Sequence, residues 1–385
     1  MKKVCVIITA RPSYSRIKTA LKAMDLNPLI DLRIILSGSA ILEKYGNIVD
    51  IVSNDGLKID YQINNVIEGH GVSESVKSVG LALIDLASCI ERIKPDLIIT
   101  IADRYETIAN AISAAYMNIP LIHIQGGEST GSIDNKVRHA ITKLSDFHFV
   151  STDLARKRVI SMGEDPKNVF KTGCPSLDLA NEIENEKNLD FNPFKKYKGT
   201  GPSFELNKGY LVVMQHPVTT EFNEAYEQTV TTINSIKNIN LPVFWFWPNV
   251  DAGSDATSKA LRVFREFNKE ANFHFFKNLD PKDFLKLVLN SSCLIGNSSV
   301  GIRECSYLGV PVVNIGSRQI GRERAKNVID TSHVNEEICN AVLKQVNHGR
   351  YEKSNLYGDG NSGFKISELI ASNNFSIKKN DFKYH

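Results

Sequence analysis

The chain of 385 residues has no long hydrophobic run, no paired cysteines and no large excess of either charge. Only a short apolar stretch separates the opening Met-Lys-Lys from Arg11, too little for a signal-peptide core or a membrane span. The six cysteines form no CxxC pair and have no metal-ligand spacing, so we expect free thiols in a reducing cytoplasm and no metal site. The net charge of +3 indicates neither a nucleic acid nor a membrane partner.

Apolar runs and helical periods alternate through both halves of the chain. Continuous apolar runs are typical of strands buried on both faces of a parallel sheet. We expect strands at residues 4–8, 32–36, 95–101, 121–124, 147–150, 169–172, 210–215, 242–247, 273–276, 294–296 and 310–314. Helices are expected between them, including residues 40–45, 74–93 and 281–289.

This alternation predicts an α/β protein of two Rossmann-like, doubly wound domains whose polar strand ends face a cleft. The expected domains are residues 1–185 and 209–362, with a tail, 363–385, packing back on the first domain. Residues 181–208, rich in Lys, Asn, Glu and Asp, are expected to form a solvated connection. No GxGxxG follows the first strand, so we expect no dinucleotide cofactor.

A turn in the second half combines features that suit a nucleotide. An apolar strand from Leu294 ends at Gly296-Asn-Ser-Ser299 and restarts as a helix. Backbone N–H groups, the hydroxyls of Ser298 and Ser299 and the helix dipole could bind a diphosphate. Glu304, one to two turns into the helix, could accept hydrogen bonds from a ribose. For this turn taken alone, serines that only cap the helix are an equal alternative.

Further polar residues follow the other expected strands and should gather at the sheet edges. Arg11 follows the first strand, where an anion site or an exposed loop residue are both consistent with the sequence. His216 is a site candidate, with a core histidine before a proline turn as the alternative. For Arg318 and Glu304 the alternative is a structural ion pair.

Taken together, these segments resemble the UDP-N-acetylglucosamine 2-epimerase family, specifically its hydrolysing members, which have the GT-B type of architecture. The segments that carry the resemblance are Arg11 with Tyr14-Ser15, Asp103-Arg104, Gly126-Gly-Glu-x-x-Gly-x-Ile-Asp134, Arg138-His-Ala-Ile-Thr-Lys143, Gln215-His-Pro-Val-Thr-Thr220, Pro248-Asn-Val-Asp-Ala-Gly253, Gly296-Asn-Ser-Ser299, Gly316-Ser-Arg-Gln-Ile-Gly-Arg322 and Tyr357-Gly-Asp-Gly-Asn361. They cover nearly the whole chain, and their order and spacing are more specific than any one segment.

The resemblance implies residue roles. The UDP-binding residues it implies are Arg11, Ser15, Arg104, Asn249, Leu279, Ser298, Ser299, Glu304 and Arg318. The catalytic candidates are Asp103, Asp134, His216, Gln125 and Glu128. Because the C2 proton of an N-acetylhexosamine is not next to a carbonyl carbon, loss of the diphosphate must lead, helped by cations, before a carboxylate takes that proton.

The chain departs from the family at two places. It has His123-Ile-Gln125-Gly-Gly where most members have His-x-Glu-Gly-Gly, and Ile101-Ala-Asp-Arg where they have His-Gly-Asp-Arg. A glutamine cannot take a proton, so the role of that carboxylate passes to Asp134, Asp103 or Glu128, or is lost. The changes suggest an altered sugar or an altered acid/base assignment.

The resemblance therefore implies hydrolysis of UDP-N-acetylglucosamine to N-acetylmannosamine and UDP, through a glycal that is then hydrated, for sialic or related nonulosonic acid synthesis. One alternative is the same reaction on UDP-2,4-diacetamido-2,4,6-trideoxyglucose. A GT-B glycosyltransferase and a UDP-sugar binding module without turnover are the others. No cofactor is expected, and a homodimer or homotetramer is implied by resemblance.

Overall fold

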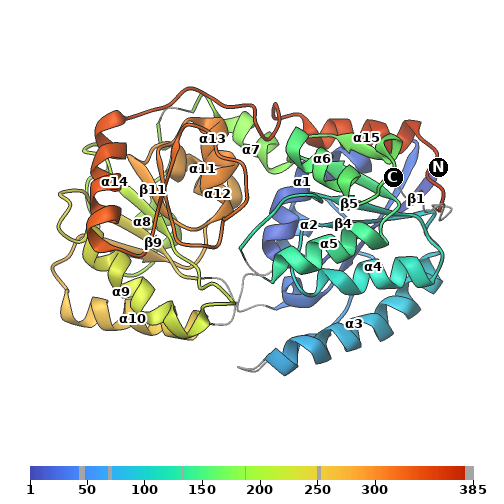
Figure 1. Ribbon diagram of the computed structural model, residues 1–385, viewed down its shortest axis with the longest axis horizontal. Helices are drawn as coiled ribbons and strands as arrows, with labels where there is room; N and C mark the ends of the chain where they lie inside the picture. The colour runs from blue at the N-terminus through green and yellow to red at the C-terminus, as the bar shows by residue number, and fades with distance from the viewer. Residues whose placement is uncertain (43–47, 68–71, 132, 187, 249–252, 378–385) are drawn as a thin grey trace. The chain divides into compact units, whose positions relative to one another are not determined.

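The computed structural model describes residues 1–385 except 43–47, 68–71, 132, 187, 249–252 and 378–385 (Figure 1). The chain divides into two compact units. Unit 1 contains Met1–Glu128, Ile133–Asp178 and Tyr357–His385, and unit 2 contains Ser129–Ser132 and Leu179–Leu356. No helix among the described residues is long and apolar enough to cross a bilayer.

Unit 1 is built on a parallel sheet of seven strands in the order β3-β2-β1-β4-β5-β6-β7. The strands are β1 (Lys2–Ile8), β2 (Ile30–Leu36), β3 (Tyr61–Gln62), β4 (Leu97–Ile101), β5 (Leu121–Ile124), β6 (Phe147–Val150) and β7 (Val169–Lys171). The chain order reverses between β1 and β4, which makes this pair the switch point of the sheet.

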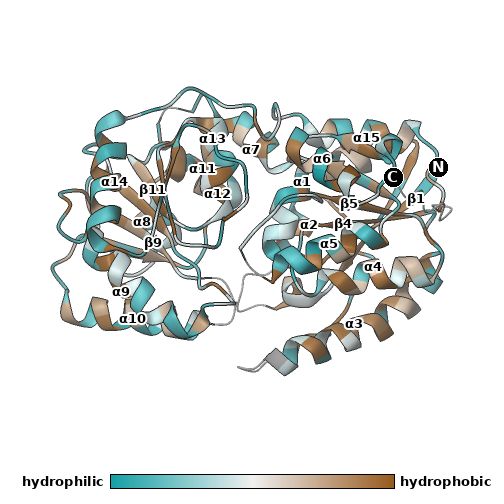
Figure 2. Ribbon diagram, in the orientation of Figure 1, coloured by the Kyte–Doolittle hydropathy of each residue, from teal (hydrophilic) through white to brown (hydrophobic). Residues whose placement is uncertain are grey.

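Helices cover both faces of this sheet because its central strands are buried on both sides. They are α1 (Arg11–Asp25), α2 (Ile48–Asn54), α3 (Val72–Ile93), α4 (Thr107–Tyr116), α5 (Asp134–Leu144), α6 (Asp153–Ser161) and α15 (Ser362–Ser372), with 3-10 turns η1 (Gly38–Ile41) and η3 (Pro166–Asn168). Helix α7 (Ser176–Ile183) begins in unit 1 and ends in unit 2. Figure 2 shows hydrophobic residues concentrated on the strands, whereas the helices carry both hydrophobic and hydrophilic residues.

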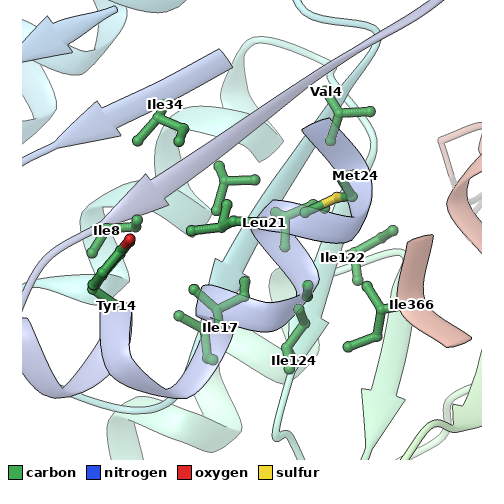
Figure 3. Packing of buried hydrophobic residues seen from close by; sticks show 14 of the residues in the cluster. Val4, Ile8, Tyr14, Ile17, Leu21, Met24, Ile34, Ile122, Ile124 and Ile366 are labelled. Atoms are coloured by element: carbon green, nitrogen blue, oxygen red, sulfur yellow. The ribbon is translucent and has the colours of Figure 1, made fainter. Parts of the chain in front are cut away.

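Helix α1 gives one face of the unit 1 core. Tyr14, Ile17, Leu21 and Met24 recur every three or four residues and are buried against the strands (Figure 3). Ile366 of α15 joins the same cluster, so this core includes a helix from the far end of the chain.

Unit 2 repeats the architecture with six parallel strands in the order β10-β9-β8-β11-β12-β13. The strands are β8 (Leu211–Met214), β9 (Val243–Phe246), β10 (Phe273–Phe276), β11 (Cys293–Gly296), β12 (Val312–Ile315) and β13 (Val328–Thr331). The helical elements are α8 (Pro193–Tyr197), η4 (Phe222–Glu224), α9 (Ala225–Ile236), α10 (Ser254–Phe267), α11 (Pro281–Leu289), α12 (Ser299–Ile302), α13 (Glu304–Leu308) and α14 (Asn335–His348). The switch point lies between β8 and β11.

The two doubly wound sheets confirm the predicted α/β architecture, with three local corrections. Residues 181–208 are not simply a solvated connection, because Phe194 and Phe204 pack on Phe244 and Thr200 pairs with Phe275. The α-helix expected over residues 40–45 is wrong for the residues that the structure describes, because a 3-10 turn, η1, occupies Gly38–Ile41. Residues 43–47 lie outside the described part of the chain.

The helix expected after the serine turn is not continuous. It breaks at Arg303, whose ψ of −73° interrupts the hydrogen-bond ladder between α12 and α13. Glu304 therefore opens a second short helix instead of lying within a longer one.

Candidate functional site

Several of the predicted site residues follow the strands at the switch points of the two sheets. In unit 1, β1 leads directly to Arg11 and β4 to Asp103 and Arg104. In unit 2, β8 leads to His216 and β11 to Ser298. Ligands of open parallel sheets bind beyond the carboxyl ends of the strands at such points, so each unit offers one candidate subsite.

An ion pair forms the centre of the unit 1 subsite. The guanidinium of Arg138 on α5 contacts the carboxylate of Asp103, and its other terminal nitrogen donates to the Glu128 carbonyl oxygen at 2.9 Å. The Arg138 side chain is only 1% exposed. The buried guanidinium therefore fixes the position and orientation of the Asp103 carboxylate.

Arg138 has no role that the sequence alone predicts, although it lies in one of the segments shared with the family. Arg138 lies four residues after Asp134, so the sequence predicts that both side chains are on the same face of one helix. Its pairing with a residue after β4 could not be read from that spacing.

Gln125, at the end of β5, is held by a hydrogen-bond chain. Its side-chain nitrogen lies 3.0 Å from the Cys174 sulfur, which lies 3.0 Å from the Ser176 hydroxyl. The residue is 1% exposed, and its side-chain oxygen has no partner among the described residues. Gln125 thus presents a fixed acceptor that cannot exchange protons.

The remaining predicted carboxylates differ in environment. Glu128 is buried and accepts a hydrogen bond from the Ser151 hydroxyl at 3.2 Å. Asp134 is the first residue of α5 and is partly buried, at the helix end whose dipole favours a negative charge. Burial therefore separates the two, with Asp134 the more accessible.

The predicted cations of unit 1 occupy loop and helix starts. Arg11 is the first residue of α1, and its carbonyl oxygen accepts from the Ser15 hydroxyl at 3.2 Å. Arg104 forms an ion pair at 3.3 Å with Glu106, whose side chain is buried. Arg11 and Ser15 lie together on one turn, while Arg104 is engaged by a neighbouring carboxylate.

Asn297 organises the unit 2 subsite. Its side-chain oxygen accepts from the His216 N–H and its side-chain nitrogen donates to the His216 carbonyl, both at 2.8 Å. Its own carbonyl accepts from Arg318 at 3.1 Å and from Gln319 at 2.8 Å. His216 and Arg318, far apart in sequence, are thus both tied to the residue after β11.

The serine turn carries out the capping role that the sequence left open. The Ser298 hydroxyl oxygen accepts from the Val300 N–H at 3.4 Å and so caps α12. Ser299 is the first residue of that helix. Glu304, the first residue of α13, is buried, and so is Leu279, which lies just before α11. Asn249 lies outside the described residues.

Comparison with known proteins gives matches over nearly the whole chain. The family model described as UDP-N-acetylglucosamine 2-epimerase matches residues 22–371. A Legionella pneumophila protein named UDP-N,N'-diacetylbacillosamine 2-epimerase (hydrolyzing) is 32% identical over 372 residues, which are 97% of this chain and 96% of that protein. The Escherichia coli polysialic acid biosynthesis protein P7 is 32% identical over 382 residues, covering 96% and 92%.

Among solved structures, the Methanocaldococcus jannaschii UDP-GlcNAc 2-epimerase in complex with UDP-GlcNAc and UDP matches with a TM-score of 0.80. The alignment covers 96% of this chain and all of that chain at 18% identity. At this identity the likeness concerns the fold, and it confirms the prediction of two Rossmann-like domains.

Proposed function

The chain belongs to the UDP-N-acetylglucosamine 2-epimerase family, and we propose that it is a hydrolysing member that releases UDP from a UDP-amino sugar while inverting C2. The observation that carries the proposal is the 32% identity to a hydrolysing relative over 97% of the chain. The Asp103–Arg138 ion pair at the unit 1 switch point supports it, because the reaction needs a carboxylate held in a fixed position.

The proposed reaction has two steps. In the first, the bond from C1 to the diphosphate oxygen breaks and UDP takes the electron pair; a carboxylate then removes the C2 proton, and the C1–C2 double bond of a glycal forms. In the second, water bonds to C1 through its oxygen and gives one proton to a carboxylate, while a proton is added to C2 on the face opposite to the one that lost it. Arg11 and Arg318 stabilise the departing charge, and Asp103, Asp134 and Glu128 are the carboxylates available for proton transfer.

For the sugar we propose UDP-2,4-diacetamido-2,4,6-trideoxyglucose. The name of the Legionella relative supports this choice. The glutamine at position 125, where most family members have a glutamate, is consistent with either an altered sugar or an altered acid/base assignment. UDP-N-acetylglucosamine, which the family resemblance implies, is the second candidate. It is supported by the polysialic acid biosynthesis protein, which is as similar to this chain as the Legionella protein, at 32% identity.

The test is NMR of the pure protein in deuterated water with each sugar nucleotide and no acceptor. We expect release of UDP and a free 2-epimerised sugar with deuterium at C2, faster for the diacetamido compound. Epimerised product that still carries UDP would indicate a non-hydrolysing enzyme. Intact donors would contradict the proposal and favour a glycosyltransferase or a binding module.

Two substitutions separate chemistry from binding. Asp134→Asn is expected to lower kcat by at least ~100-fold with little change in UDP affinity, because it removes a proton-transferring group. Arg318→Ala is expected to weaken UDP binding by about 10-fold or more, since it removes a charged hydrogen-bond donor. Calorimetric titration with UDP measures the affinity, and Arg262→Ala on the exposed face of α10 is the control. Equal loss of UDP binding in both variants would contradict this division.

We also propose a homo-oligomer, on the basis of the family resemblance. Light scattering coupled to size-exclusion chromatography gives the mass in solution, against 42.9 kDa for one chain. A monomeric mass at micromolar concentration would contradict it.

A further inference from the structure

Two neighbouring strands of unit 1 end in a left-handed residue that is not glycine. Ala102 follows β4 and Gln125 follows β5, and both have φ of 68°. Such a conformation costs free energy in an L-residue, so surrounding contacts must hold it. The Ala102 N–H donates to the Ile124 carbonyl oxygen at 3.1 Å and so continues the hydrogen bonds between β4 and β5. This bond holds the N–H of Ala102 but not its carbonyl group.

The carbonyl group of Ala102 is held by His123. The His123 Nε2 lies 3.0 Å from the Ala102 carbonyl oxygen, and its Nδ1 lies 3.1 Å from the Thr142 hydroxyl. The ring is fully buried. His123 therefore bridges the end of β4 and helix α5 from its position on the intervening strand.

The protonation of the ring follows from burial and from its partners. Desolvation lowers the pKa of His123 to about 3, which keeps the ring neutral at physiological pH. Because a carbonyl oxygen only accepts, the single ring proton belongs on Nε2. The lone pair of Nδ1 then faces the Thr142 hydroxyl, whose one hydrogen lies within reach of both Nδ1 and the Arg138 carbonyl oxygen. With both nitrogens engaged and no solvent access, the ring has no capacity for proton transfer.

Both partners of the catalytic ion pair are attached to this bridge. Asp103 directly follows Ala102, and Arg138 lies one turn before Thr142 on α5, where the Thr142 hydroxyl is also 3.0 Å from the Arg138 carbonyl oxygen. A change at the ring would therefore move the carboxylate and its guanidinium relative to each other.

We propose that His123 is a positioning residue which, by holding Ala102 in its left-handed conformation, fixes the Asp103 carboxylate against Arg138 for the proton transfer at C2. The proposal rests on the proposed function for its role in turnover, but its geometric part is independent of it. His123 touches no substrate in this scheme and acts through the backbone.

Two substitutions distinguish positioning from proton chemistry. Glutamine places its amide nitrogen near the position of Nε2, so His123→Gln keeps the donor to the Ala102 carbonyl. Asparagine reaches only the position of Nδ1, so His123→Asn keeps the contact with Thr142 and loses that donor. We expect His123→Gln to retain kcat within about 5-fold and His123→Asn to lose ~100-fold in kcat with little change in KM, because a misplacement of about 1 Å can have that effect.

Glycine at position 102 tests the mechanism of the effect. Glycine adopts positive φ without strain, so Ala102→Gly needs less support from the ring. We expect Ala102→Gly to restore at least ~10-fold of the kcat lost in His123→Asn. Equal kcat losses in the glutamine and asparagine variants, or no recovery in the double variant, would overturn the proposal.

Crystal structures of the two His123 variants test the positioning role without turnover. The Asp103–Arg138 contact should persist in His123→Gln and be displaced in His123→Asn. If wild-type protein releases no UDP, the proposed function fails, and these structures still decide whether the bridge positions Asp103. An unchanged ion pair in both variants would overturn the inference whatever the activity.

Discussion

At the scale of single residues, the unit 1 subsite depends on buried polar side chains that contact one another and the backbone. Arg138 reaches both Asp103 and the Glu128 carbonyl, and the Gln125 amide is tied to Cys174. Hydrogen bonds in a buried environment are strong when complete and costly when one partner is lost. Substitutions here should therefore change geometry and stability together, and each needs a matched control.

The backbone at Ala102 gives a stability prediction. Ala102→Gly relieves a left-handed alanine, so we expect the free energy of unfolding to rise by up to about 1 kcal/mol. Ala115→Gly, in the right-handed backbone of α4, should lower it by about 1 kcal/mol. Denaturant unfolding followed by circular dichroism measures both. A loss in Ala102→Gly as large as in the control would contradict the strain at this position.

The buried ring of His123 gives a pH prediction. Its folded-state pKa of about 3 lies below the ordinary 6.5, so the unfolded chain takes up a proton that the folded chain refuses. The stability associated with the neutral ring is present above pH 6.5 and is lost as the pH falls toward 3. At pH 5 the expected loss is about 2 kcal/mol relative to pH 8.

His123→Gln removes this titration. Its stability should fall by about 2 kcal/mol less than that of the wild type between pH 8 and pH 5. Burial also lowers the pKa of His139 and His333, so a residual slope of the same sign should persist. Parallel unfolding curves for wild type and variant at both pH values would contradict the assignment of a neutral His123.

At the scale of elements, the position of a site residue is set by the strand that precedes it. Apolar runs predicted most strands to within one or two residues, because parallel strands are buried on both faces and leave an unambiguous pattern. The same pattern placed Asp103 and His216 at strand ends. It could not identify His123 or Asn297, since their hydrogen-bond partners lie on neighbouring strands and depend on the register of the sheet.

Short elements with mixed composition were the ones that the sequence mispredicted. The break at Arg303 and the packing of Phe194 and Phe204 on Phe244 arise from tertiary contacts that no local pattern contains. Polar residues around those phenylalanines indicated a solvated segment, although the aromatic rings determine where the chain lies.

Asn297 offers a test at this scale, because its carboxamide extends the ladder between β8 and β11 beyond their ends. Asn297→Ala leaves the His216 N–H and carbonyl without these partners in a buried place, and should cost about 2–3 kcal/mol of stability. Asn290→Ala, at the end of α11, removes one hydrogen bond to the Lys286 carbonyl from a half-buried side chain and should cost under ~1 kcal/mol. Thermal unfolding compares the two, and similar shifts in both would contradict the role of Asn297.

At the scale of the whole molecule, the last described helix completes the first unit. Helix α15 lies beside α1 in Figure 1, and a Cβ on Gly363 would be 2.7 Å from the Ala20 nitrogen. Asp178 caps this helix by accepting from the N–H groups of Ser362 at 2.8 Å and Gly363 at 2.6 Å. The contact is thus close-packed and specifically hydrogen-bonded.

Loss of that cap should loosen the helix. Asp178→Ala leaves two buried N–H groups without their acceptor, so we expect a loss of about 2–3 kcal/mol in the stability of unit 1. Hydrogen exchange should show faster exchange in α15 and α1, with α9 and α14 of unit 2 unaffected. Asp359→Ala, which removes a half-exposed ion pair with Lys365, is the control and should change little. Uniform exchange in all four helices would contradict a local role.

Because Ile366 and Ile370 belong to the same core as Ile17 and Leu21, unit 1 combines segments that are synthesised before and after nearly all of unit 2. Its sheet can form during synthesis, but the face of α1 that they cover stays open to water until translation has passed residue 370. Unit 2, encoded within one nearly continuous stretch, can finish first. Unit 1 therefore begins to form first but is completed last.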